Sequence, residues 1–93
     1  MLSFEIALFG LPSNLTKLRK VQVKLNEGAK LGDLVAALRQ AIPALDGVVI
    51  QTGENNLKDY YGFNINGQFY YGKQQLSLKR GDKIILITLA TRG

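Results

Sequence analysis

The feature that most constrains the fold is a change in the hydrophobic period along the chain. Residues 3–9 (SFEIALF) and 20–25 (KVQVKL) alternate between apolar and polar side chains, as half-buried β-strands do. Between Ala29 and Pro43 the period becomes that of an amphipathic helix, and from residue 61 onward strand-like runs return. One helix among several strands has to pack across one face of their sheet. The sequence therefore predicts an α+β fold with a single sheet.

The alternation also assigns side chains to faces. In the first strand one face carries Phe4, Ile6 and Leu8, and the other carries Glu5, Ala7 and Phe9. Phe9 is thus expected on the solvent side. The helix is predicted from one apolar stripe and ends at Pro43, which lacks the amide that a helix interior needs. The stripe consists of Leu31, Leu34, Val35, Leu38 and Ile42.

The C-terminal half contains two turn motifs. Asn66-Gly67 joins two β-prone runs and predicts a hairpin, because both positions of its turn need positive φ. Residues 80–82 (RGD) predict a tight turn into the final strand. The first and last strands are the most apolar, so we expect them to pair in the middle of the sheet. Residues 45–61 have no clear period, and "GVVIQT" is either a short strand or an irregular cover.

Both faces of the final strand are apolar. Ile84 and Leu86 can face the core, whereas Ile85, Ile87 and Leu89 lie on the opposite face. Together with Phe9, these three residues would form an exposed apolar patch, the usual sign of a protein interaction surface. The alternative is that the middle segment, around 48–50, folds over that face.

Composition limits the chemistry of the chain. Its 93 residues form a single predicted domain, 1–93, and contain neither cysteine nor histidine. This removes thiolate nucleophiles, disulfides and the usual general base at neutral pH. Asp33, Asp59 and Asp82 fall where caps and turns need aspartate, so no active site or bound cofactor is expected. With no apolar run near membrane-spanning length and no signal peptide, we expect no membrane partner and a cytoplasmic location.

The net charge of +5 comes from two loose basic groups. They are Lys17, Arg19, Lys20 and Lys24, and Lys79, Arg80 and Lys83. Either they are solvated loop ends, or they steer an acidic protein or a polynucleotide to the chain. No recognised RNA or DNA motif accompanies the charge, so nucleic acid is not the expected partner.

The last residues, 90–93, read as a small flexible tail: Ala90, Thr91, Arg92 and Gly93. Such a segment is either a frayed terminus or the working part of the protein. Beyond Leu89, four residues span at most about 13–14 Å when extended, which is enough to enter a partner.

Three segments resemble the ubiquitin-like β-grasp sulfur carriers, which include the small subunit of molybdopterin synthase and the thiamine-pathway carrier. "EGAKLGDLVAAL" with Ile42-Pro43 is similar to the start of the family's helix, "FNINGQ" to its hairpin, and "LSLKRGDKIILITL" to its final strand. The likeness runs nearly end to end, and the 45–61 region resembles the longer archaeal-type versions.

The resemblance implies a ubiquitin-like β-grasp fold with a mixed sheet of four to five strands. It also implies a function that needs no catalytic side chain. A separate adenylating enzyme uses ATP to activate the C-terminal carboxylate, here that of Gly93, and sulfur then replaces AMP to give a thiocarboxylate. A synthase subunit accepts the sulfur, and the patch of Phe9, Ile85, Ile87 and Leu89 would dock both partners. By this resemblance the chain is at most the small subunit of a sulfur-transferring synthase and binds no cofactor itself.

The tail departs from the family's Gly-Gly at Arg92, which adds a long charged side chain where the partner's channel closes around bare backbone. A partner with a wider, acidic channel, a domain that has lost activation, and a different natural terminus are all compatible with it. Two other functions also stay open. One is a β-grasp interaction module that never carries sulfur, and the other is a ubiquitin-like modifier that is transferred to lysine amines.

Overall fold

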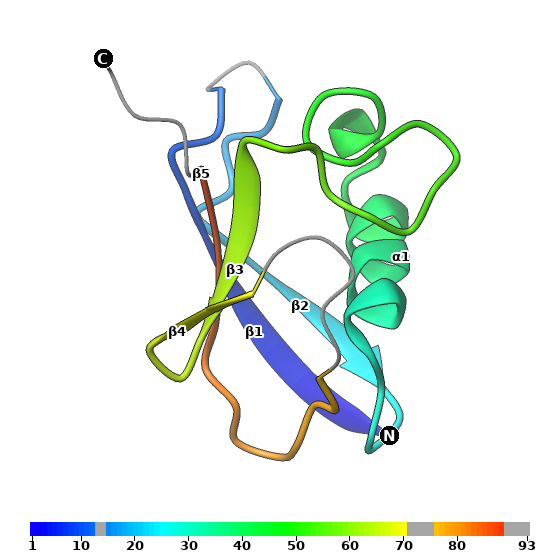
Figure 1. Ribbon diagram of the computed structural model, residues 1–93, viewed down its shortest axis with the longest axis vertical. Helices are drawn as coiled ribbons and strands as arrows, with labels where there is room; N and C mark the ends of the chain where they lie inside the picture. Colours follow the sequence, from blue (N-terminus) through cyan, green and yellow to red (C-terminus); the bar gives the residue numbers. More distant parts are fainter. Residues whose placement is uncertain (13–14, 71–75, 89–93) are drawn as a thin grey trace.

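A computed structural model describes residues 1–12, 15–70 and 76–88 of the chain. Five strands and one α-helix make up the fold (Figure 1). In chain order they are β1 (Leu2–Phe9), β2 (Lys20–Leu25), α1 (Leu31–Ala41), a short 3-10 helix (Pro43–Leu45), β3 (Tyr61–Ile65), β4 (Gln68–Tyr70) and β5 (Ile84–Thr88).

The strands form one mixed sheet in the order β2-β1-β5-β3-β4. β1 and β5 pair in parallel near its centre, with Ile6 opposite Ile84 and Leu8 opposite Leu86. The remaining pairs, β1 with β2, β3 with β4 and β3 with β5, are antiparallel. The expected central pairing of the first and last strands is confirmed, as is the α+β class with a five-stranded sheet.

The core lies between the sheet and α1. Alternate residues of β1 are buried on this side, and so are Ile84 and Leu86 of β5 and the whole predicted helical stripe. The alternation in the sequence therefore assigned the inner face of β1 correctly. Leu34, Leu38 and Leu86 have no exposed surface at all.

Local polar contacts fix the ends of α1. The Lys30 backbone N–H donates to Asp33 Oδ2 at 3.0 Å, which is a capping contact at the helix start. At the other end the Ile42 N–H still donates to Leu38 O at 2.8 Å, and Pro43 follows. Asp33 thus has the capping role expected for it, and proline ends the helix as predicted.

The predicted hairpin turn is present, with φ of 55° at Asn66 and 90° at Gly67. The Asn66 side chain also links this hairpin to the turn before β5. Its Nδ2 donates to Asp82 Oδ1 at 2.8 Å, and its Oδ1 accepts the Lys83 N–H at 2.9 Å. Asp82 in turn accepts the Lys79 N–H. Asp82 therefore has the turn-forming role that the sequence suggested.

Residues 46–60, for which two interpretations were open, are irregular apart from isolated β-bridges. Arg39 of α1 holds this segment. Its Nε donates to Asp46 Oδ1 at 2.9 Å, and its other nitrogens donate to the Asn55 side chain and to the carbonyls of Gln51 and Glu54. One helical arginine thus replaces a regular ladder in ordering the segment.

The segment lies on the same side of the sheet as α1 (Figure 1). Leu45, Val49, Ile50 and Leu57 from this region are buried in the core beside the helix. The alternative that residues 48–50 cover the opposite face is therefore wrong. The segment is a second cover for the inner face.

We predict that Leu38→Ala lowers the free energy of unfolding by about 2–5 kcal/mol, because it leaves a cavity at a fully buried position. Urea denaturation measures this change. The matched control is Val48→Ala at a position that is 40% exposed, for which we expect a loss below about 1 kcal/mol. Equal losses for the two variants would contradict the assignment of the core.

Candidate docking surface

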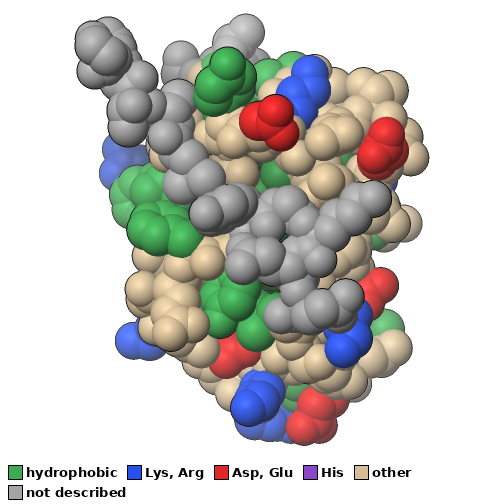
Figure 2. Space-filling model, viewed as in Figure 1, with side chains coloured by type: hydrophobic (Ala, Val, Ile, Leu, Met, Phe, Trp, Pro, Cys, Tyr) green, Lys and Arg blue, Asp and Glu red, His purple; other side chains and the backbone are tan. Residues whose placement is uncertain are grey.

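The sheet face turned away from α1 carries the apolar patch expected from the sequence. Parallel pairing sets Phe9 beside Ile87, and Ala7 beside Ile85. Phe9 is 56% exposed, and both isoleucines are half-buried. In the space-filling view apolar side chains gather at the left, on the side away from α1 (Figure 2). The structure thus brings together three of the four predicted patch residues.

The fourth predicted patch residue, Leu89, lies outside the described residues. So do the tail residues Ala90, Thr91, Arg92 and Gly93. The last residue that the structure describes before them is Thr88, at the end of β5.

The sequence analysis missed one aromatic residue on this face. Phe69 of β4 lies opposite Asn64 of β3, and Asn64 lies opposite Ile85 of β5. A row across the sheet therefore runs from Ala7 through Ile85 and Asn64 to Phe69, which is 50% exposed. The hairpin at Asn66-Gly67 could have revealed this position, because it fixes the register of β3 and β4 and hence the face of Phe69.

The half of this face farther from the end of β5 is charged. Lys20 and Lys24 of β2 and Lys83 before β5 are exposed there, around the single acidic residue Glu5. Lys20 Nζ lies 3.6 Å from Glu5 Oε2. A shallow groove of about 350 Å³ with Glu5, Lys83 and Ile85 among its lining residues follows the β1–β5 junction. The two basic groups of the sequence thus both contribute to one surface.

Close backbone packing surrounds the end of β5. Thr88 Oγ1 donates to the Tyr60 carbonyl at 3.2 Å on the β3 side. On the β1 side lies Gly10, with φ of 72°, where a Cβ would meet Thr88 Cγ2 at 2.4 Å. Only glycine fits this close approach. The place where the chain leaves the sheet is therefore fixed by neighbours on both sides.

The structure gathers no catalytic constellation from the aspartates. Asp33 and Asp82 are engaged in a cap and a turn, and Asp59 lies in the turn before β3. Within residues 1–12, 15–70 and 76–88 no three metal-ligating side chains cluster. In the same residues no helix is long and apolar enough to cross a membrane.

One helix across a five-stranded mixed sheet, with parallel first and last strands at the centre, defines a ubiquitin-like β-grasp protein. No protein-family model matches the sequence, and no curated protein sequence matches it. Similarity is found among solved structures.

The crystal structure of small archaeal modifier protein 1 (SAMP1) from Haloferax volcanii superposes with a TM-score of 0.78 at 27% identity, over 98% of this chain and 99% of that chain. The solution structure of SAMP1 from Methanosarcina acetivorans gives a TM-score of 0.72 at 21% identity, over 100% and 98% of the two chains. A putative molybdopterin converting factor, subunit 1, from Pyrococcus furiosus gives 0.66 at 16% identity, over 97% and 100%. The last two show similarity of fold alone.

These neighbours confirm the resemblance to ubiquitin-like β-grasp proteins that the sequence motifs indicated. They are described as a modifier protein and as a converting-factor subunit, which bears out the expectation that the chain is not an enzyme by itself. The longer archaeal versions expected from residues 45–61 are also represented, because all of these organisms are archaea.

We predict opposite outcomes for two neighbouring substitutions in β5. Ile87→Asp alters the half-buried outer face, so it should cost about 1–2 kcal/mol and leave the protein folded. Leu86→Asp buries a carboxylate in the core and should unfold it. Circular dichroism and thermal denaturation distinguish the two, and unfolding by Ile87→Asp would show that the outer face is part of the core.

Proposed function

We propose that the chain is a sulfur carrier, whose C-terminal carboxylate at Gly93 is adenylated by a partner enzyme and converted to a thiocarboxylate. The observation that carries the proposal is the outer apolar surface of β1 and β5, because β5 is the strand that leads directly into residues 89–93. A partner that binds Phe9 and Ile87 is thereby positioned next to the segment it would activate.

The chemistry assigned to the partner has two steps. A carboxylate oxygen of Gly93 attacks the α-phosphate of ATP, and pyrophosphate leaves. A sulfide nucleophile then attacks the acyl carbon, AMP leaves with the bridging oxygen, and a thiocarboxylate remains. Neither step needs a side chain of this protein, which suits a chain without histidine or cysteine. ATP belongs to the partner, and the carrier binds no cofactor.

Cofactor biosynthesis of the molybdopterin or tungstopterin type is the favoured destination of the sulfur. It is supported by the fold shared with a putative molybdopterin converting factor subunit from Pyrococcus furiosus. The partners are then an adenylating enzyme and a sulfur-accepting synthase subunit, and the site of action is the cytoplasm. The apolar patch with Phe69 supplies the docking surface, and Lys20, Lys24 and Lys83 favour acidic groups on the partner.

A second candidate function is protein modification, in which the activated Gly93 is transferred to a lysine amine. It is supported by the similarity to SAMP1, which is described as a modifier protein. Both functions share the adenylation step and differ in the nucleophile that displaces AMP. A pure interaction module, the third reading, uses the same surface and leaves the tail dispensable.

We predict that incubation with ATP, sulfide and the adenylating enzyme of the same cell raises the intact mass by about 16 Da, as one oxygen is replaced by sulfur. Mass spectrometry measures the change. The matched variants are a chain lacking Gly93, which should not react, and Arg92→Gly, which should react at least as well. An intact mass of the natural protein establishes its terminus beforehand.

No mass change, with the enzyme active on a Gly-Gly carrier, would overturn the carrier proposal. Reaction of Arg92→Gly alone would show that Arg92 blocks activation. A covalent conjugate to lysine without a thiocarboxylate would favour the modifier function instead.

We predict that Phe9→Ala weakens binding to the adenylating enzyme by about tenfold or more, because exposed aromatic anchors dominate interface energies. Titration calorimetry measures the affinity. Val48→Ala removes a similar exposed side chain on the α1 side and should leave the affinity unchanged. Equal affinities of both variants and the unaltered protein would place the docking surface elsewhere.

A further inference from the structure

β2 forms one edge of the sheet. It pairs with β1 alone, from Lys20 opposite Ala7 to Leu25 opposite Leu2. Within the part of the chain that the structure describes, no other strand or loop forms a backbone ladder with its outer side. Such an edge presents unpaired backbone N–H and C=O groups, which can accept an additional strand.

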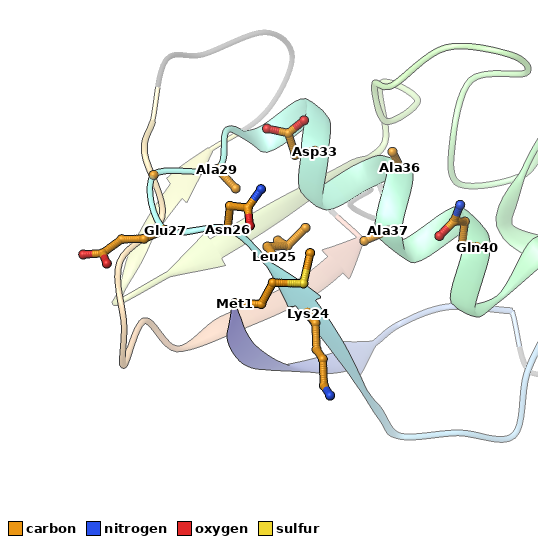
Figure 3. A pocket seen from close by; sticks show the side chains of 11 residues that line it. Met1, Lys24, Leu25, Asn26, Glu27, Ala29, Asp33, Ala36, Ala37 and Gln40 are labelled. Atoms are coloured by element: carbon orange, nitrogen blue, oxygen red, sulfur yellow. The ribbon is translucent and has the colours of Figure 1, made fainter.

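A groove lies between this edge and α1, with a volume of about 470 Å³ (Figure 3). Lys24 and Leu25 of β2 line one side, and Asp33, Ala37 and Gln40 of α1 line the other. The spacing of the three helical residues places them along one side of the helix over about 10 Å. This length matches three to four residues of an extended peptide, at about 3.3 Å each.

Short side chains keep the groove open. Ala36 and Ala37 of α1 line it, where longer residues would fill it. Ala37 and Val21 pack against the core but stay only partly buried. An added strand beside β2 would cover both of them, because alternate side chains of that strand would point toward α1 as Val21, Val23 and Leu25 do. Apolar side chains are the ones that fit at these positions.

The other face of the same edge is basic. Lys20, Gln22 and Lys24 alternate with the apolar residues of β2 and point away from α1. Lys20 is paired with Glu5, whereas Lys24 has no ion-pair partner among the described residues. Residues of an added strand that face the same way would lie beside these lysines, and acidic side chains are favoured there. The acidic residues Glu27 and Asp33 lie at the loop end of the groove, past the end of β2.

We propose that the β2 edge and the adjoining groove bind an extended peptide segment of a partner protein in which apolar and acidic residues alternate. The segment adds a sixth strand to the sheet. Its apolar side chains enter the groove beside Ala37, and its acidic side chains lie beside Lys20 and Lys24. This site is separate from the Phe9 patch and does not depend on the proposed sulfur-carrier function.

A second copy of the chain fits this edge poorly. Symmetric antiparallel pairing of two β2 strands about Gln22 would set Lys20 of one copy opposite Lys24 of the other. Like charges directly opposite each other destabilise a strand pair. The charge of the edge therefore favours an acidic partner over a homodimer.

The test uses the full chain labelled with nitrogen-15 and a soluble synthetic peptide of about six alternating valine and glutamate residues. We expect amide NMR shifts to change along β2 and on the groove side of α1, and to stay unchanged around Phe9 and Ile87. Two control peptides should not bind at the same concentration. One carries lysine in place of glutamate, and the other carries a central proline, which removes an N–H from the ladder.

Two variants check the contacts. Ala37→Leu fills the groove and should weaken peptide binding about tenfold, while the outer face keeps its shifts. Lys24→Glu should weaken it about fivefold, whereas Arg80→Glu, with the same change in net charge at the turn before β5, should have no effect.

Several results would overturn the proposal. They are equal binding of the lysine peptide, peptide shifts confined to the Phe9 face, unchanged binding by Ala37→Leu, and no shifts at millimolar peptide. Concentration-dependent shifts of β2 without any peptide would assign the edge to a second copy instead.

Discussion

The parallel pairing of β1 with β5 is the contact on which the rest of the structure depends. It joins Ile6 to Ile84 and Leu8 to Leu86, and the buried sides of both strands form the floor on which α1 packs. The two hairpins attach to this pair from either side, β2 through β1 and β4 through β3. Loss of the central pair would leave two separate hairpins, and isolated hairpins are marginally stable in water.

The same pair gives the sheet two different faces. The inner face is covered twice, by α1 and by the irregular segment that Arg39 holds. The outer face is left with half-buried isoleucines and two exposed phenylalanines. Since the described inner cover is complete and the outer face is open, the interaction surface and the terminus of β5 lie on one side of the molecule. Binding on that side does not require the core to rearrange.

Periodicity was sufficient for the parts of the fold where one face is buried. It predicted β1, β2, α1 and the hairpin at Asn66-Gly67, because burial on one face and positive φ in a turn leave local patterns. It could not order residues 46–60, whose arrangement depends on hydrogen bonds from one side chain of α1. Those bonds reach mainly backbone carbonyls, which any sequence supplies.

The candidate sites show the same division. Phe9, Ile85 and Ile87 were predictable because each lies in a strand with a clear alternation, whereas Phe69 lies in a strand of only three residues. The groove beside β2 was not predictable, because it results from the distance between an edge strand and small residues on a helix. Alanine in a helix has no sequence pattern that separates a groove from a plain surface.

The central position of β5 also orders events during synthesis of the chain. Ile6 and Ile84 are 78 residues apart, so β1 leaves the ribosome about 4–16 s before its partner at usual rates of elongation. During that interval β1 has only β2 beside it, and the apolar row of Phe4, Ile6 and Leu8 has no completed sheet to pack into. The nascent protein is therefore exposed to aggregation until its last strand has been made, and chaperone binding to β1 would matter most in that interval.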